Sequence, residues 1–181
     1  MRIISGKYKG KRLNAPKNLP VRPTTDMAKE ALFNILYNRY DFDEISICDL
    51  FAGTGNISFE FASRGTKRIT SVDQNSGCIN YINKIDKELN LNLSTVKSEV
   101  FRYLEKTHQT FDVIFADPPY DIPEEDFQKL VLTIFKMNLL NQNGLLIIEH
   151  SKQTDLSLMA NFVQVKIYGS NCFSFFSAVE E

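Results

Sequence analysis

The chain has 181 residues, of which 43% are hydrophobic and 24% charged, and its formal net charge is −1. This composition is ordinary for a folded domain in water, and the length predicts one domain with a core of its own. No apolar run approaches the roughly 18 residues of a membrane helix, and the charged start MRIISGKYKGKRL does not resemble a signal peptide, so we expect a cytoplasmic protein.

The cysteines and histidines argue against the common metal sites. Cys48, Cys78 and Cys172 are odd in number and far apart, and none belongs to a CxxC pair. His108 and His150 have no second histidine at metal-ligand spacing. We therefore expect reduced thiols, no structural zinc site and no metal in the reaction.

The first 22 residues form a strongly basic segment. They hold seven Lys or Arg and no acid, whereas the rest of the chain holds 14 basic and 22 acidic side chains. Residues such as Gly6, Tyr8 and Gly10 alternate with the charges, which favours a short ribbon over the alternative, a solvated tail. A basic arm on an acidic body can bind phosphates locally. We predict that it binds nucleic acid through Arg2, Lys7, Lys9, Lys11, Arg12 and Arg22.

Helical and strand patterns alternate beyond a connector with three prolines. A helix over 26–40 follows the connector, and Thr25 or Asp26 can cap its first amides. Apolar runs predict strands at 45–50, 68–73, 93–97, 111–117 and 144–150, and helical spacing predicts helices at 56–65, 76–89, 99–108, 124–137 and 154–160. Residues 161–181 alternate like a hairpin that turns at 169–171. This order predicts an α/β fold with a parallel sheet covered on both faces, made mixed by the closing hairpin.

The stretch DLFAGTG lies between the first strand and a helix. Gly53 and Gly55 let the backbone turn tightly and approach a ligand, and the helix behind them offers free amides. The third glycine of a dinucleotide fingerprint would fall at Ser58, which argues against a bound pyrophosphate. Asp49, at the start of the stretch, favours a ligand that carries an amine or hydroxyls. A plain glycine-rich turn is the alternative.

Asp73 ends the next strand, 18 residues beyond Gly55. In doubly wound folds, an acid about 20 residues after the glycine loop accepts hydrogen bonds from the ribose hydroxyls. A cap on the following helix is the alternative, and Asp73 could serve both purposes. Together with the glycine loop, the spacing predicts a ribose contact.

The stretch FDVIFADPPY places a carboxylate and two prolines at the end of an apolar strand. Proline restricts its own backbone and that of the residue before it, so Asp117, Pro118 and Pro119 are held stiffly. A carboxylate and rigid carbonyls can accept both N–H groups of an exocyclic base amine and so direct its lone pair at an electrophile. Tyr120 offers a ring for base stacking, worth about 1–3 kcal/mol. A rigid turn that caps the helix at Pro123 is the alternative.

These motifs together resemble the class I S-adenosylmethionine methyltransferases. DLFAGTG is similar to their glycine loop, Asp73 to their ribose acid, and DPPY to the tetrapeptide of enzymes that methylate exocyclic amines. The closer resemblance is to the RsmD family, the bacterial 16S ribosomal RNA guanine-N2 methyltransferases. It rests on RIISGKYKGKRL, RPTTDMAKEALFNIL, EFASRG and YGSNCFSFF, and it spans essentially the full chain. The chain departs from the family pattern at Asn56 and Ser58, where Gly or Ala is usual, and at Glu99, where Asp or Asn is usual.

The resemblance implies a Rossmann-like fold, with a mixed, mostly parallel seven-stranded sheet and helices on both faces. Residues 1–24 would form the basic ribbon and residues 25–181 the methyltransferase domain. The expected residues of the S-adenosylmethionine site are Thr24, Thr25, Asp49, Phe51, Gly53, Gly55, Asp73, Gln74, Glu99, Val100 and Asp117. The expected catalytic residues are Asp117, Pro118, Pro119 and Tyr120.

The resemblance further implies methyl transfer to the N2 amine of a guanine in 16S ribosomal RNA. The expected partner is the small ribosomal subunit or its assembly intermediates. We expect the protein to be a monomer and not to bind membranes. Two alternatives remain open. A DNA adenine-N6 methyltransferase shares the tetrapeptide, although 181 residues leave little room for a region that reads duplex sequence. A non-catalytic assembly factor that binds ribosomal RNA would not need the acceptors of DPPY.

Overall fold

The computed structural model describes residues 1–16, 19, 24–119 and 121–178. The predicted roles of Arg22 and Tyr120 fall on positions outside the described residues. The helices are α1 (Asp26–Tyr37), α2 (Asn56–Ser63), α3 (Ser76–Leu89), α4 (Val100–Lys106) and α5 (Glu124–Lys136). The strands are β1 (Ser46–Leu50), β2 (Arg68–Asp73), β3 (Ser94–Lys97), β4 (Phe111–Ala116), β5 (Leu140–Ser151), β6 (Phe162–Tyr168) and β7 (Asn171–Phe176).

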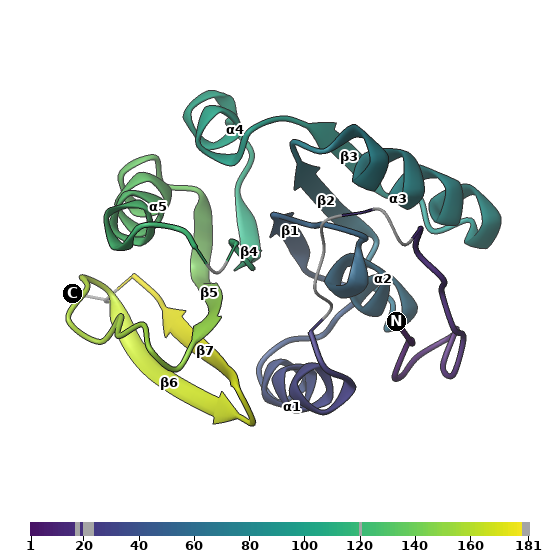
Figure 1. Cartoon of the computed structure of the whole chain (residues 1–181), viewed down its shortest axis with the longest axis horizontal. Coiled ribbons are helices and arrows are strands. Elements are labelled where there is room, and N and C mark those ends of the chain that lie inside the picture. Colours follow the sequence, from purple (N-terminus) through teal and green to yellow (C-terminus); the bar gives the residue numbers. More distant parts are fainter. Residues whose placement is uncertain (17–18, 20–23, 120, 179–181) are drawn as a thin grey trace.

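The seven strands form one sheet in the order β3-β2-β1-β4-β5-β7-β6 (Figure 1). The first five strands in this order run parallel, and β7 is antiparallel to both β5 and β6. The predicted Rossmann-like fold with a mixed sheet is therefore confirmed. Because the strand order reverses between β1 and β4, a crevice is expected at the carboxyl ends of these two strands.

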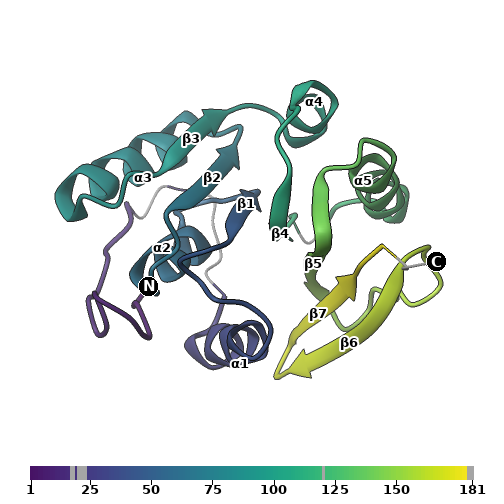
Figure 2. The same cartoon turned by 180° about the vertical axis from the view of Figure 1, so that it is seen from behind.

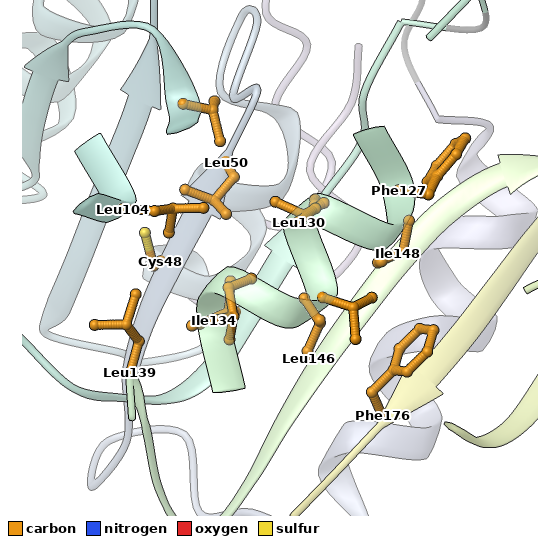
Figure 3. Packing of buried hydrophobic residues seen from close by; sticks show 14 of the residues in the cluster. Cys48, Leu50, Leu104, Phe127, Leu130, Ile134, Leu139, Leu146, Ile148 and Phe176 are labelled. Atoms are coloured by element: carbon orange, nitrogen blue, oxygen red, sulfur yellow. The ribbon is translucent and has the colours of Figure 1, made fainter. Parts of the chain in front are cut away.

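Helices cover both faces of the sheet, as Figures 1 and 2 show from opposite sides. On one face, α4 and α5 contribute residues such as Leu104 and Leu130 to a cluster that includes Leu50 of β1 and Leu146 of β5 (Figure 3). On the other face, α1 and α2 pack through Phe33 and Phe61. The central strands are buried on both sides, which explains their nearly continuous apolar sequence.

The N-terminal arm folds back on itself as the short ribbon that the sequence predicts. A single antiparallel bridge joins Arg2 and Arg12, and the Ile3 amide donates to the carbonyl of Lys11 at 3.0 Å. Ile3 and Leu13 are buried in a cluster with residues of α2 and α3. The arm is therefore packed onto the body of the protein.

Two predicted elements differ from the structure. The short helix predicted at 154–160 is wrong, since this segment contains irregular backbone, turns and a bend but no helix. The Asp155 side chain accepts from the Ser157 amide at 2.9 Å, and such local bonds compete with helix formation. The strand predicted at 144–150 extends over 140–151 as β5, with a register shift opposite 111–113. Within the described part of the chain, no helix has both the length and the apolar character to cross a membrane.

Candidate active site

A cleft of about 890 Å³ lies at the carboxyl ends of β1, β2 and β4, beside the reversal of strand order. The loops after these strands and the first residues of α2 and α4 border it. Its described lining residues are Thr24, Asp49, Phe51, Ala52, Gly53, Thr54, Asn56, Ile57, Asp73, Gln74, Asn75, Cys78, Glu99, Val100, Phe115, Asp117, Pro118 and Pro119. The three motifs singled out in the sequence thus meet in one cavity.

The glycine loop turns through three residues with positive φ. Phe51 has φ 57°, Gly53 has φ 53° and Gly55 has φ 79°. A bulky residue in the left-handed region is uncommon and is typical of functional loops. Gly55 is not among the lining residues; it precedes α2 as the N-cap residue, where an added Cβ would lie 3.0 Å from both Ile82 and Phe59. Its left-handed backbone and this close packing beneath the loop together favour glycine at the position.

Asp73 is held by the backbone on both of its carboxylate oxygens. Oδ2 accepts from the Gly53 amide at 2.8 Å and Oδ1 from the Asn75 amide at 2.7 Å. The first bond ties the acid to the glycine loop, and each oxygen keeps a further lone pair. The cap of α3 is Asn75, whose side chain accepts from Gly77 and Cys78. The helix cap, which was the alternative role for Asp73, is thus provided by Asn75.

Asp49 is buried beneath the loop and is 2% exposed. Its Oδ2 accepts from the Ser58 amide at 3.0 Å and from the Ser58 hydroxyl at 2.5 Å. Since that hydroxyl hydrogen is used, Ser71 donates in turn to the Ser58 oxygen, at 2.7 Å. Burial raises the pKa of Asp49 to about 7, although the Ser58 bonds oppose the shift and the Asp73 charge adds to it. Ser58, a departure from the family pattern, thus holds the acid in place.

Glu99 and Val100 line the end of the cleft nearest β3. The Glu99 carboxylate caps α4, because it accepts from the amides of Phe101 and Arg102 at 3.0 and 2.9 Å. Val100 is the first residue of α4, so its amide has no partner within the helix. The Glu99 side chain is therefore bonded to its own helix. The free backbone amide of Val100 is better placed than the Glu99 carboxylate to bond a ligand in the cleft.

The segment after β4 joins the two central strands at the mouth of the cleft. The Asp117 amide donates to the Leu50 carbonyl at 3.4 Å, which ties the end of β4 to the end of β1. The carbonyl of Pro119 accepts from the Ile122 amide at 3.0 Å and closes a tight turn. Asp117, Pro118 and Pro119 all line the cleft.

Of the two predicted threonines, Thr24 is the one among the described lining residues of the cleft. Thr25 instead caps α1 by accepting from the Ala28 amide at 3.2 Å. The Thr24 hydroxyl donates to the buried Glu149 at 2.8 Å, and Asn171 donates to the other oxygen of Glu149. Sequence reasoning missed Glu149 because its partners lie in distant parts of the chain.

The predicted RNA-binding cations lie on the arm and are not among the described lining residues of the cleft. Arg2 pairs with Asp26 and Lys11 with Glu88, each at 3.0 Å. The Lys7 ammonium lies 5.0 Å from the centre of the neighbouring Tyr8 ring. Lys9 and Arg12 are also exposed.

The EFASRG signature anchors this arm to α2. Glu60 accepts from the amides of Ile4 and Ser5 at 2.8 and 3.1 Å. The Ser63 hydroxyl accepts from the Tyr8 amide at 3.0 Å and donates to the Ser5 carbonyl at 2.6 Å. The signature therefore has a structural explanation: its polar side chains replace the strand partner that the arm lacks.

Lys29 is a buried cation that sequence reasoning missed. Its ammonium donates to the Arg2 carbonyl at 2.7 Å and to Asn56 Oδ1 at 2.8 Å, and it lies 3.4 Å from Glu60. Burial lowers the pKa of Lys29, but the Glu60 carboxylate opposes that shift. The signal in the sequence is its spacing, since Lys29 falls on the buried side of α1 together with Leu32.

Comparison with known proteins decides the family. The sequence model of the family described as Conserved hypothetical protein 95 matches residues 1–177. Ribosomal RNA small subunit methyltransferase D from Haemophilus influenzae is 30% identical over 173 residues, which cover 92% of this chain and 86% of that protein. The chain belongs to the RsmD family.

Solved structures extend the likeness of this RsmD-family chain to the whole fold. Hypothetical protein TTHA0928 from Thermus thermophilus has a TM-score of 0.85 at 25% identity, with 98% of this chain and 99% of that chain covered. SMU.776, solved as a complex with SAH, has a TM-score of 0.65 at 19% identity, with 82% of this chain and 49% of that chain covered. At this identity the likeness shows the fold alone. The methyltransferase names of the relatives support S-adenosylmethionine as the cofactor, as the sequence predicts.

The chemistry of the cleft fits S-adenosylmethionine. Asp73 offers fixed acceptors for two ribose hydroxyls, and the Val100 amide offers a donor to an adenine nitrogen. The volume lies within the roughly 300–1,000 Å³ of small-molecule sites. Among the residues that the structure describes, no group of three or more His, Cys, Asp or Glu could hold a metal ion.

Proposed function

We propose that this chain transfers a methyl group from S-adenosylmethionine to the exocyclic N2 amine of a guanine in 16S ribosomal RNA. The observation that carries the proposal is the meeting, in one cleft, of the glycine loop, Asp73 and the segment Asp117-Pro118-Pro119. The relative from Haemophilus influenzae, which is named for small subunit ribosomal RNA, supports the ribosomal substrate.

The proposed roles at the cofactor follow the order of the lining residues. Asp73 accepts from the ribose, and Val100 with Glu99 borders the adenine. The glycine loop from Asp49 to Gly53 borders the methionine moiety. S-adenosylmethionine supplies an activated methyl group on its sulfonium.

The proposed catalytic groups act on the target amine. Asp117 and the Pro118 carbonyl accept the two N–H groups of guanine N2, so the nitrogen lone pair leaves the conjugated ring system and becomes available for attack. No strong base is needed beforehand, because the amine becomes acidic as its new bond to carbon forms. The carbon–sulfur bond of the sulfonium would break at the same time, with S-adenosylhomocysteine as the leaving group, and Asp117 would accept the proton that the amine loses. The prolines keep both acceptors in place, and orientation of this kind can contribute about 7–11 kcal/mol.

The guanine is proposed to come from a single-stranded RNA loop, where bases can be turned out of the stack. Stacking by Tyr120 stays a prediction from the sequence. The proposed partner is 16S RNA within the small subunit or its assembly intermediates, with phosphates contacted by the arm. In this proposal, residues 1–24 form the arm, residues 25–181 form the catalytic domain, and the protein works as a monomer.

The test is tritium transfer from labelled S-adenosylmethionine to small subunits from a strain that lacks its own enzyme. We expect label in N2-methylguanine and none in duplex DNA. Asp117→Ala should lower the rate at least about 100-fold, because the amine loses its charged acceptor, while S-adenosylhomocysteine still binds.

Asp121→Ala is the matched control, since Asp121 is an exposed acid only four residues further along the chain. We expect this variant to keep its activity. Retention of most activity by Asp117→Ala would remove the acceptor role, and label in duplex adenine would support the alternative DNA substrate. Binding of subunits without any methyl transfer by the unmodified protein would support an assembly factor.

A further inference from the structure

The described residues of the cleft include no cation that could pair with an anionic group of a ligand. Four acids line the cleft, namely Asp49, Asp73, Glu99 and Asp117, and its described lining residues include no Lys, Arg or His. The methionine moiety of the proposed cofactor carries a carboxylate as well as an ammonium group. The ammonium group suits these acids, and the described lining residues can offer the carboxylate neutral donors only.

Asn56 is oriented to supply such a donor. The Lys29 ammonium, which can only donate, lies 2.8 Å from Asn56 Oδ1, so the amide oxygen must face Lys29. Its nitrogen then faces the other way, toward the cleft that Asn56 lines. Nδ2 donates one hydrogen to the Thr24 carbonyl at 3.4 Å, and the second N–H has no acceptor among the described residues.

The charge behind Asn56 is positive. Glu60 lies between two cations, 3.4 Å from Lys29 and 2.8 Å from Arg64. Lys29 and Glu60 are almost fully buried, at 1% and 0% exposure, and Arg64 is 10% exposed. One carboxylate faces two cations, so this cluster carries a net charge of +1. In a site of low dielectric, that charge strengthens the amide as a donor to an anion.

The other polar groups near Asn56 are engaged elsewhere. The Thr24 hydroxyl donates to Glu149 at 2.8 Å. The Thr54 hydroxyl donates to the Met1 sulfur at 3.9 Å. Asn56 is therefore the side chain best prepared to meet a carboxylate.

We propose that Asn56 Nδ2 donates a hydrogen bond to the carboxylate of the methionine moiety of S-adenosylmethionine, and that Lys29 is the positioning residue that fixes the amide. This inference rests on the proposed function for its ligand but not for the RNA target. It gives a role to Asn56, the residue that follows the glycine loop.

The test is titration calorimetry with two ligands. S-adenosylhomocysteine has the carboxylate, whereas 5′-methylthioadenosine lacks the whole amino-acid moiety. Asn56→Asp keeps an acceptor for Lys29 but replaces the donor by a negative oxygen. We expect affinity for S-adenosylhomocysteine to fall about 10- to 100-fold, as for loss of a hydrogen bond to a charged group, with 5′-methylthioadenosine changed less than about two-fold.

Asn83→Asp is the matched control. Asn83 is also half-buried and also accepts through Oδ1, from Thr95 at 2.8 Å, but it lies on α3 and is not a described lining residue of the cleft. We expect its affinities for both ligands to be unchanged. Lys29→Gln should reproduce part of the selective loss, and Lys29→Arg, which keeps a cationic donor, should restore it.

Two results would overturn the inference: an unchanged affinity of Asn56→Asp for S-adenosylhomocysteine, or an equal loss for both ligands, which would indicate a merely structural role. If the unmodified chain binds neither ligand, the proposed cofactor fails as well. If the selective loss is found but no guanine is methylated, the proposed target fails while the assignment of Asn56 stands.

Discussion

At the scale of single residues, the acids of the cleft differ in how the protein holds them. Two separate backbone amides hold the two oxygens of Asp73. Ser58 holds Asp49 on one oxygen, through its amide and its hydroxyl, and the Asp49 side chain is almost fully buried. Burial raises the pKa of Asp49, and the nearby charge of Asp73 adds to that shift.

Asp49 should make the free energy of unfolding depend on pH. Its pKa is about 7 in the folded chain against an ordinary value of 3.8, so between these values the folded chain holds a proton that the unfolded chain has lost. The free energy of unfolding should therefore fall as pH rises from about 4 to about 7, and this contribution should stay constant above that. Urea unfolding of the ligand-free protein at about pH 4.5 and about pH 8 should show a smaller decline in Asp49→Asn.

Asp112→Asn serves as the control for this pH dependence. Burial raises the pKa of Asp112, but the Ser46 and Asn141 donors outweigh it and hold the pKa below its ordinary value. Asp112 is then ionised in both states over the same pH range, so its replacement should shift stability equally at both pH values. An identical pH dependence in Asp49→Asn and the unmodified chain would mean that Asp49 is ionised in the fold.

At the scale of elements, the arm and α2 form one unit through backbone contacts. Gly6 has φ +82°, and an added Cβ would lie 1.9 Å from the Ser63 carbonyl oxygen. Gly10 has φ +83°, and an added Cβ would have no neighbour within 4 Å among the described residues. The two glycines share a conformation but differ in their distance from α2.

Gly6→Ala should therefore loosen the arm, whereas Gly10→Ala should not. Both substitutions carry the cost of a left-handed alanine, about 1–2 kcal/mol. Gly6→Ala adds a clash with the backbone, which should cost a further 1–3 kcal/mol or so. Hydrogen exchange at the amides of Ile4 and Ser5, both bonded to Glu60, should accelerate in Gly6→Ala far more than in Gly10→Ala. Equal exchange rates in the two variants would argue against docking of the arm on α2.

The buried cation of α1 should contribute far more to stability than an exposed one. Lys29→Met leaves the Arg2 carbonyl and the Asn56 oxygen without their donor, and breaking a buried ion pair costs about 3–5 kcal/mol. Lys11→Met removes a pair whose side chains are 35% and 49% exposed, so it should cost less than about 1 kcal/mol. Urea unfolding measures both, and similar losses would show that the Lys29 pair is no stronger than a surface pair.

Local patterns allowed most elements to be predicted, and long-range contacts explain most of what could not be. The spacing of apolar residues and glycines located the strands, the glycine loop and Asp73, because these depend on neighbours in the sequence. Thr24 and Glu149 are 125 positions apart, so no local pattern links them. The incorrectly predicted helix at 154–160 shows the opposite limit, because a local bond such as that of Asp155 to the Ser157 amide competes with helical spacing.

At the scale of the whole molecule, the arm begins beside the cleft and extends away from it. Met1 contacts Thr54, which lines the cleft, whereas Ile3 and Leu13 of the arm pack with residues of α2 and α3. The arm lies beside these two helices (Figures 1 and 2). A substrate that engages the exposed cations of the arm as well as the cleft must therefore span the surface between them. A folded RNA or a ribosomal particle meets that requirement more readily than a single nucleotide.

Replacement of the exposed cations of the arm by neutral residues should therefore reduce the salt dependence of subunit binding. Each phosphate contact contributes about 0.7–0.9 to the slope of log affinity against log salt. Lys9→Gln with Arg12→Gln should lower that slope by about 1–2, and both residues are exposed. The control pair is Lys136→Gln with Lys152→Gln, on α5 and just beyond β5, away from the arm (Figure 1). An equal change in slope for the two pairs would remove the arm from the RNA interface.

The docking of the arm also has a consequence for synthesis of the chain. The arm leaves the ribosome before α3 does, yet the Tyr8 hydroxyl donates to the carbonyl of Leu89, 81 residues later. Translation at about 5–20 residues per second needs several seconds to make that partner. Until then, the seven cations of residues 1–22 are exposed beside the ribosome that is making them. A growing chain of this protein can therefore meet ribosomal RNA through its arm before its own cleft has formed.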